Sequence, residues 1–301
     1  MTEPQERACP VCRGTDYAPF AAEHIDANRM NEFSYASRKT PEFMRLSLVE
    51  CTSCDLVYAP RPPAFEQLHS AYKEAAYDSS EEANFAARTY ARILKPHLPE
   101  KSARTCAVDI GAGNGALLPK LQELGYGVVV GVEPSHSAIA TAPANVAPLL
   151  REGMFDREII RDVVPDLVVS CMTMEHVDDP GTVLKTVREV LAPGGLAALV
   201  VHNRRGLINR MLGLRSPIMD IEHLQLFSPK SIRELLQRAG FTHVRVSPFA
   251  NKYPLRYWVR LLPLPSRVKD RLLSILERIG LASLPLALRV GNMVAVGVKE
   301  G

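Results

Sequence analysis

The chain has 301 residues, of which 47% are hydrophobic and 23% charged, and its formal net charge is only +3. This composition is ordinary for a soluble globular protein, and the length allows one full domain plus a smaller module. The small net charge does not by itself indicate nucleic-acid binding. No apolar run reaches the roughly 18 residues that a membrane span needs, and the polar N-terminus has no secretory core. We therefore expect a cytoplasmic protein.

Four of the six cysteines form two Cys-x-x-Cys pairs near the N-terminus, namely Cys9 with Cys12 and Cys51 with Cys54. In a reducing compartment, such pairs favour the four thiolate ligands of a tetrahedral zinc ion over a disulfide framework. A redox pair or unpaired thiols are the alternatives. Four sulfurs leave no open position for water, so we expect structural Zn²⁺. The spacing predicts a zinc-ribbon-like module over residues 1–62, with a loop or short helix inserted between the pairs, and a larger domain over residues 63–301.

The larger domain opens with a strand and a glycine-rich turn, in which Asp109 precedes Gly111, Gly113 and Gly115. Glycines at alternate positions allow a sharp turn and the close approach of a ligand, and the helix that follows directs its first N–H groups at the turn. Glu133 ends the next strand, near the roughly 20-residue interval at which an acid binds a ribose. The spacing differs from G-x-G-x-x-G, and Asp109 would repel pyrophosphate. The ligand indicated is an aminoacyl nucleoside rather than a dinucleotide.

Three later segments continue this pattern in order: a strand at 166–170, the sequence Met174-Glu175-His176-Val177-Asp178-Asp179-Pro180, and the turn 192–195 before a strand at 196–201. With the Asp-x-Gly-x-Gly-x-Gly turn and its downstream acid, they resemble class I S-adenosylmethionine-dependent methyltransferases over about residues 85 to 300. The resemblance implies an α/β fold with a doubly wound, Rossmann-like, seven-stranded sheet. Its third strand is expected at 146–150. Its last strand, 291–298, should lie antiparallel between the fifth strand and the sixth at 244–246.

The resemblance also implies the residues that bind the cofactor S-adenosylmethionine. Asp109 and Gly111 would border its methionine part, and Glu133 would hold its ribose. Met154 and Phe155 lie where relatives have the adenine loop, and we expect them to form an apolar wall for the ring; ordinary core packing is the alternative. The complete predicted set is Asp109, Gly111, Ala112, Gly113, Gly115, Glu133, Met154, Phe155, Ser170 and Cys171.

Histidines are the candidates for proton removal, because they titrate near neutral pH and follow strands at the edge where α/β sheets bind ligands. His223 is the first choice for a general base or an acceptor contact, and His176 is the second. The alternatives are that His223 orients its loop and that His176 packs beside the cofactor. His202 and Asn203, after the fifth strand, are predicted to contact the methyl acceptor.

Basic residues concentrate in two later stretches, after the fifth strand and over residues 251–280. In the second stretch they alternate with Trp and Leu and include an amphipathic helix at 268–279. Such a segment suits an anionic membrane surface, which would make the protein peripheral at the inner membrane face, or a phosphorylated, lipid-linked substrate. A solvated lid helix packed on the protein's own core is the alternative. The oligomeric state is left open.

The leading hypothesis is therefore a methyltransferase acting on a small-molecule acceptor, favouring a sugar, nucleotide-sugar or lipid-linked saccharide. Carbon, oxygen and nitrogen acceptors all stay open. The first alternative is a ribosomal RNA base methyltransferase, but the chain has no Asn-Pro-Pro-Tyr-type motif and no strongly basic N-terminal module. The second is a non-catalytic scaffold that binds the cofactor or a membrane.

Overall fold

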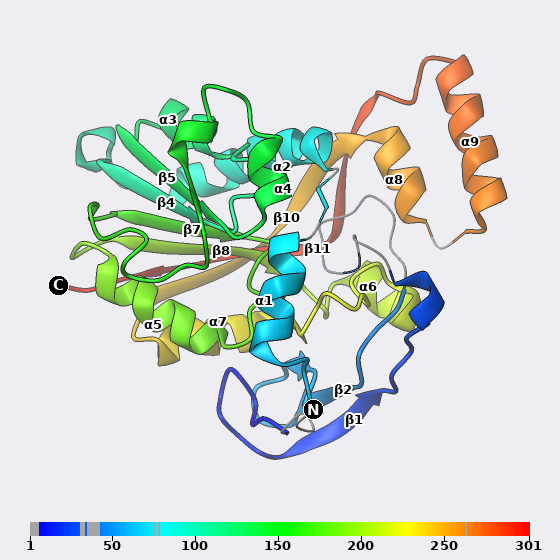
Figure 1. The fold of residues 1–301 in the computed structure, drawn as a ribbon, viewed down its shortest axis with the longest axis horizontal. Helices are drawn as coiled ribbons and strands as arrows, with labels where there is room; N and C mark the ends of the chain where they lie inside the picture. Colours follow the sequence, from blue (N-terminus) through cyan, green and yellow to red (C-terminus); the bar gives the residue numbers. More distant parts are fainter. Residues whose placement is uncertain (1–5, 31–33, 35–42, 75, 78, 263) are drawn as a thin grey trace.

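The computed structural model describes residues 6–30, 34, 43–74, 76–77, 79–262 and 264–301. Its main body is a seven-stranded sheet in the order β10-β11-β8-β7-β4-β5-β6 (Figure 1). The strands are β4 Cys106–Ile110, β5 Val128–Glu133, β6 Leu150–Glu152, β7 Leu167–Cys171, β8 Leu196–His202, β10 Thr242–Pro254 and β11 Pro285–Val298. Strands β4 to β8 run parallel, and β11 pairs antiparallel with both β8 and β10. The predicted α/β fold and the place of the last strand are confirmed.

Helices cover both faces of this sheet, because alternate residues of the central strands point to opposite sides. Val108 and Ile110 of β4 join a core with α5 (Pro180–Val190) and α7 (Pro229–Arg238). Ala107 of the same strand joins a core with α2 (Ser80–Leu94) and α3 (Leu118–Glu123). Strands buried on both faces are expected to be mostly apolar, as β8 is, and the polar residues within β4 and β5 are Asp109 and Glu133. A short helix, α4 (His136–Ala140), follows β5.

One strand differs from its prediction. Residues 146–150 were expected to be extended, but Ala147–Leu149 form a 3-10 helix, and β6 begins only at Leu150. Pro148 has no N–H to donate to a sheet, which accounts for the difference. Three further 3-10 helices are Lys95–His97, Lys101–Ala103 and Gly213–Arg215.

The N-terminal residues form a second sheet of four strands in the order β1-β2-β3-β9. Its strands are β1 Tyr17–Ala21, β2 Leu48–Cys51, β3 Val57–Tyr58 and β9 Gln225–Leu226. The fourth strand thus comes from the larger domain, so the two parts share a sheet. Between the cysteine pairs lies a 3-10 helix, Ala27–Arg29, while positions 31–33 and 35–42 of the predicted insertion lie outside the described residues. The module boundary at residue 62 stays a prediction.

Four helices lie around one edge of the main sheet (Figure 1). Helix α1 (Phe65–Glu74) precedes α2, and α6 (Leu207–Leu212) follows β8. Helices α8 (Leu255–Leu261) and α9 (Ser266–Arg278) form an insertion between β10 and β11, and α9 projects away from the body. None of the described helices is long and apolar enough to span a bilayer.

Candidate active site

A cavity of about 710 Å³ lies at the carboxyl ends of β4, β5, β7 and β8, and α1, α6 and α8 also contribute to its walls. This is the edge at which open α/β sheets bind ligands. One part of its lining is the glycine turn after β4, and another is a group of histidines from three separate parts of the chain. The cavity therefore joins the predicted cofactor site and the predicted acceptor site.

The glycine turn adopts a shape that side chains would prevent. Gly111 has φ of +73°, and a Cβ there would lie 2.3 Å from Oγ1 of Thr173. Gly113 has φ of +55° and lies under the ring of Tyr77, at ordinary contact distance from a Cβ. The N–H groups of Gly111 and Ala112 donate to the carbonyl of Val132, at 2.9 and 3.1 Å. The turn is thereby held against the end of β5, where the predicted ribose acid stands.

Glu133 ends β5 and is buried, with 8% of its surface exposed. Its Oε2 accepts a hydrogen bond from the Gly113 N–H and its Oε1 from the Ser135 N–H, both at 2.8 Å. Burial raises the pKa of Glu133, and these two hydrogen bonds oppose that shift. A carboxylate fixed by two N–H groups keeps lone pairs for further donors, as the two ribose hydroxyls would be.

Asp109 lies in the same wall and is almost fully buried. Burial, together with the nearby charge of Glu133, raises the pKa of Asp109 to about 8. Its Oδ1 has no hydrogen-bond partner among the described residues. Buried polar atoms are normally paired, so this oxygen fits a cationic ligand group such as the ammonium of S-adenosylmethionine.

The other predicted cofactor residues divide into two groups. Met154, Phe155 and Cys171 line the cavity, as do Gly111, Ala112 and Gly113. Gly115 and Ser170 are not among the lining residues; a Cβ on Gly115 would lie 2.5 Å from Val146, and Ser170 is fully buried. Gly115 is therefore placed for packing between the turn and its neighbours.

The predicted histidines come together at one wall of the cavity. The rings of His176 and His223 are 4.9 Å apart, and those of His202 and His223 are 5.2 Å apart, measured between centroids. They come from the loop after β7, the end of β8 and the loop before β9, so His223 lies between the other two. Tyr72 of α1 packs edge-on against His176 and donates to its carbonyl at 3.2 Å.

Each histidine of this cluster has its Nδ1 next to an acceptor. Nδ1 of His176 lies 3.0 Å from the Glu222 carbonyl, and that of His223 lies 2.9 Å from the Ile218 carbonyl. Carbonyls only accept, so both Nδ1 atoms carry the proton and both Nε2 atoms have a lone pair in the neutral ring. Burial lowers the pKa of His176, which favours its neutral form.

His202 has a different partner, the fully buried carboxylate of Glu175. Oε1 of Glu175 lies 3.1 Å from Nδ1 of His202 and accepts from its backbone N–H at 2.6 Å. A carboxylate at this position stabilises the protonated ring, which a carbonyl does less well. Asn203, predicted beside His202, is not among the cavity-lining residues, and its Oδ1 accepts from the Arg205 N–H.

The N-terminal sheet holds the loop that carries Glu175 and His176. Arg7 donates to the carbonyls of Asp178 (2.7 Å) and Ala59 (2.9 Å). Gln225 of β9 donates to the carbonyls of Met174 and Val177, both at 2.6 Å. The two acidic residues of the Asp178-Asp179 motif thus face the N-terminal part, where Arg13 pairs with Asp179 at 2.7 Å.

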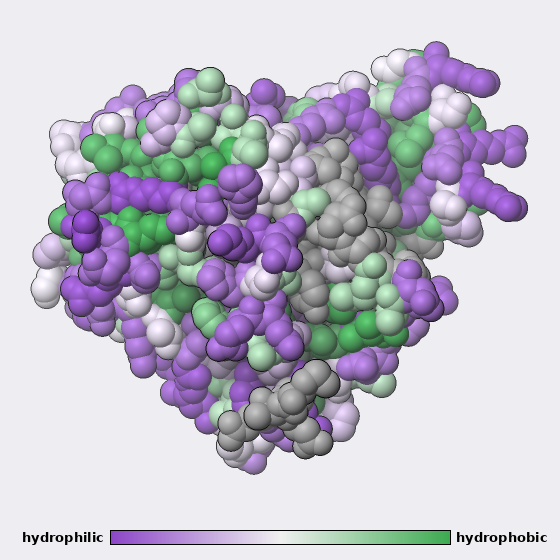
Figure 2. Space-filling model, in the orientation of Figure 1, coloured by the Kyte–Doolittle hydropathy of each residue, from purple (hydrophilic) through white to green (hydrophobic). Residues whose placement is uncertain are grey.

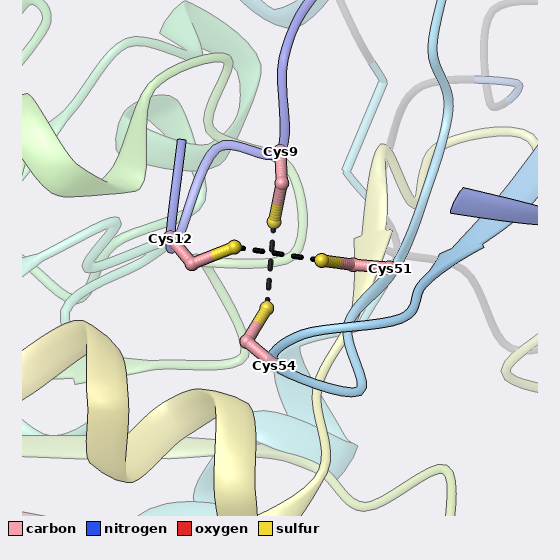
Figure 3. Close-up of side chains that lie close together, drawn as sticks. All are labelled: Cys9, Cys12, Cys51 and Cys54. Atoms are coloured by element: carbon pink, nitrogen blue, oxygen red, sulfur yellow. Dashed lines mark hydrogen bonds between the residues drawn. The ribbon is translucent and has the colours of Figure 1, made fainter. Parts of the chain in front are cut away.

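The four predicted cysteine ligands gather in the N-terminal part and are buried (Figure 3). Cys9 and Cys54 have their sulfurs 3.4 Å apart, as do Cys12 and Cys51, and all four lie within 4.8 Å of one another. Zinc–sulfur bonds of about 2.3 Å give a tetrahedron with edges of about 3.8 Å. The donor set and its dimensions therefore fit a Zn²⁺ ion with four thiolate ligands.

Two arginines of the stretch after β8 have a structural partner. Arg204 and Arg205 both pair with Glu50 and Asp55, and Arg204 to Glu50 measures 2.6 Å. Although burial opposes it, hydrogen bonds from Arg205 and the charge of Arg204 lower the pKa of Asp55 to about 2. These arginines fasten the N-terminal sheet to the larger domain.

Comparison with known proteins agrees with this geometry. The family profile described as a methyltransferase domain matches residues 79–246. The chain belongs to the S-adenosylmethionine-dependent methyltransferases. The fold resembles that of the Haemonchus contortus phosphoethanolamine N-methyltransferase 2 in complex with S-adenosylmethionine, with a TM-score of 0.53, 18% identity, and coverage of 81% of this chain and 62% of that one.

Curated relatives match over shorter stretches. The ubiquinone biosynthesis O-methyltransferase of Caulobacter sp. (strain K31) is 34% identical over 103 residues, which are 32% of this chain and 40% of that protein. The protein of the same name from Aeromonas salmonicida (strain A449) is 26% identical over 166 residues, covering 49% of this chain and 69% of that protein. The match to the first relative thus spans less than half of its length.

Sequence reasoning missed several residues of the cavity. Asn251 of β10 and Asn292 of β11 are buried in its wall, and Oδ1 of Asn251 has no partner among the described residues. Met172, the residue before Thr173, also lines the cavity. Its φ of +55° is uncommon for a residue other than glycine. Both asparagines lie in strands that also contain other polar residues, so the sequence distinguished neither of them.

Proposed function

We propose that this methyltransferase transfers a methyl group from S-adenosylmethionine to a hydroxyl oxygen of a small molecule. The observation that carries the proposal is the single cavity, which joins Asp109 and Glu133 at one wall to the histidine cluster at another. Oxygen comes first among the acceptors because a neutral hydroxyl is a weak nucleophile that gains from proton removal by a histidine during attack, whereas a neutral amine can attack without a base. The names of the curated relatives, ubiquinone biosynthesis O-methyltransferases, support the same acceptor atom.

One group of residues would bind the cofactor, and another would remove the proton. S-adenosylmethionine supplies an electrophilic methyl group on its sulfonium. Asp109 would hold the ammonium, Glu133 the ribose hydroxyls, and Met154 with Phe155 the adenine ring. Binding both reactants in one enclosed site aligns the acceptor for in-line attack and excludes water.

His202 is the group that we propose as the general base, with Glu175 stabilising its protonated ring. This ranks His202 above His223, which the sequence put first, because Oε1 of the buried Glu175 lies 3.1 Å from Nδ1 of His202. His223, between the other two rings, would contact the acceptor hydroxyl, and His176 would pack beside the cofactor. Asn251 and Asn292 offer further polar contacts to the acceptor.

The acceptor skeleton is proposed more broadly. A sugar, a nucleotide-sugar or a lipid-linked saccharide carries the required hydroxyl, and so does a phenol. Arg204 and Arg205 are ion-paired with Glu50 and Asp55, so they give no support to a phosphorylated acceptor in particular. The name of the first relative, a ubiquinone biosynthesis O-methyltransferase, favours a hydroxylated aromatic acceptor. A saccharide is the second candidate.

We propose that Zn²⁺ bound by Cys9, Cys12, Cys51 and Cys54 is structural. Since the four thiolates fill its coordination, the ion would stabilise the N-terminal part and, through Arg7 and Gln225, the loop that carries Glu175.

Calorimetry and methyl-transfer assays test the function together. In calorimetry, the protein should bind S-adenosylhomocysteine and should not bind NAD. In the transfer assay, labelled methyl groups should pass from S-adenosylmethionine to a catechol probe more readily than to its dimethyl ether. Binding of NAD in preference to S-adenosylhomocysteine would contradict the cofactor assignment. Equal labelling of catechol and its ether would contradict an oxygen acceptor.

A further inference from the structure

Helix α9 exposes an apolar stripe to solvent. Val268, Leu272, Ile275 and Ile279 are between 37% and 58% exposed. Their spacing of four, three and four residues places them on one face of the helix. Burying this stripe would be favourable, and none of the thirteen residues of α9 is buried in the structure.

This stripe is separate from the face by which α9 packs on the protein. Leu273 and Leu276 are half-buried, and α9 contacts α8. At about 100° per residue, these two leucines lie on a neighbouring face, roughly a quarter turn or more from the stripe. A lid helix that only covered its own core would need the face with Leu273 and Leu276. It would not need the exposed apolar stripe. The stripe therefore indicates an additional contact.

Basic side chains border the stripe on its other side. Arg267, Arg271 and Arg278 share the flank opposite the α8-facing leucines, by the same helical geometry. In the part of the chain that the structure describes, none of the three forms an ion pair, whereas Arg256 and Arg260 of α8 lie against Glu81 and Glu82. Figure 2 shows long hydrophilic side chains extending from the edge of the molecule where α9 projects. An apolar stripe bordered by unpaired arginines matches an anionic surface with an apolar interior.

Exposed apolar residues also occur on α6 and after α8, where these segments line the cavity. Ile208 of α6 and Leu262 after α8 line the cavity and are themselves 37% and 42% exposed. Leu207 and Met211 of the same helix α6 are 72% and 77% exposed. The surface formed by α6, α9 and Leu262 is called the apolar rim below.

We propose that the apolar rim docks on an anionic lipid bilayer, with the stripe of α9 entering the interface and the three arginines contacting lipid phosphates. Long arginine side chains can reach the head groups while apolar neighbours are buried below them. A bilayer docked in this way would face the opening of the cavity, so an acceptor could enter from the membrane. The docking surface does not depend on the identity of that acceptor.

Vesicle flotation of the full chain tests the proposal. The wild type should float with vesicles that contain phosphatidylglycerol and much less with vesicles of phosphatidylcholine alone. Ile275→Glu should lower the partition coefficient between vesicle and solution about tenfold or more, because a charge replaces an apolar side chain that enters the bilayer interface. Arg271→Gln and Arg278→Gln should each lower it about fivefold, and only on anionic vesicles.

Val164→Glu is the matched control, because Val164 is 67% exposed and lies outside the apolar rim. Its flotation should equal that of the wild type. The proposal is overturned if the wild type stays in solution with anionic vesicles, if it floats equally with both lipids, or if Ile275→Glu and Val164→Glu behave alike.

Two further measurements separate the remaining outcomes. Sedimentation should give the same mass for the wild type and Ile275→Glu without lipid; a dimer that Ile275→Glu dissociates would make the rim a contact between two copies and overturn the bilayer assignment. Calorimetry with S-adenosylhomocysteine should give equal affinities for the wild type and Ile275→Glu. A wild type that floats but does not bind S-adenosylhomocysteine would contradict the proposed function and leave the docking surface standing.

Discussion

The two ends of the cavity are built in different ways. The proposed cofactor end is built around one continuous stretch, in which β4, the glycine turn and β5 bring Asp109 and Glu133 together within residues 106–133. The proposed acceptor end combines His176, His202 and His223 from two loops and the end of β8. Its geometry depends on a sheet shared with the N-terminal part. A local motif thus fixes one end, and long-range packing fixes the other.

This difference predicts different responses to damage. A substitution at the cofactor end should change binding of the nucleoside and leave the rest of the protein intact. Damage to the N-terminal part should act on the acceptor end first, because Arg7 and Gln225 hold the loop that carries Glu175 and His176.

Loss of a cysteine ligand should have the largest effect. Cys51→Ser should lower the metal content from about one zinc per chain and sharply lower the thermal midpoint, because structural zinc contributes about 10–16 kcal/mol of apparent binding free energy in small metal-dependent domains. Metal analysis and thermal unfolding measure both effects. Cys106→Ala is the control, since Cys106 is a buried thiol of β4 outside the cluster. Full metal content in Cys51→Ser would contradict the site.

The second prediction concerns the base at the acceptor end. His202→Ala should lower kcat about 10²- to 10⁴-fold, the usual contribution of a positioned base, with little change in affinity for S-adenosylhomocysteine. Glu175→Gln should also lower kcat, because an amide stabilises the ring that gains a proton during the reaction less well than a carboxylate does.

Exposed His243 provides the control for this prediction, and His243→Ala should keep wild-type kinetics. A larger loss of kcat in His223→Ala than in His202→Ala would return the base to His223. An unchanged kcat in Glu175→Gln would contradict the proposed role of Glu175 in stabilising the base.

The same contrast explains what the sequence could predict. Asp109, the glycines and Glu133 could be proposed from the sequence because a nucleoside-binding turn depends on spacing along the chain, and the structure brings these residues together at one wall of the cavity. The four cysteines were found because thiol pairs have a restricted chemistry. The histidines were named one by one, but their mutual contacts and the Glu175–His202 pair depend on the packing of separate loops. Asn251 was missed because a buried amide has no pattern along the chain.

The third prediction returns to the cofactor end. Glu133→Ala should raise the dissociation constant of S-adenosylhomocysteine roughly 10- to 100-fold, because hydrogen bonds to a charged group contribute about 1.5–3 kcal/mol. Calorimetry measures the change directly. Glu152→Ala is the matched control, since Glu152 ends the neighbouring strand and is exposed. Equal affinities in Glu133→Ala and the control would remove the ribose role.

The smallest effect is a pH dependence of cofactor binding. Burial raises the pKa of Asp109 to about 8. Between about pH 4 and pH 8, the folded protein without cofactor therefore holds a proton on Asp109 that the unfolded chain has lost. This group therefore makes the free protein less stable as pH rises from about 4 to about 8.

An ammonium bound against Asp109 favours the carboxylate instead, and binding should release a proton. The affinity for S-adenosylhomocysteine should then rise with pH, at most about tenfold per unit, and level off above pH 8. Calorimetry in two buffers of different ionisation enthalpy measures the released proton. Asp109→Asn should abolish both the release and the slope, and an unchanged slope in that variant would assign the proton to another group.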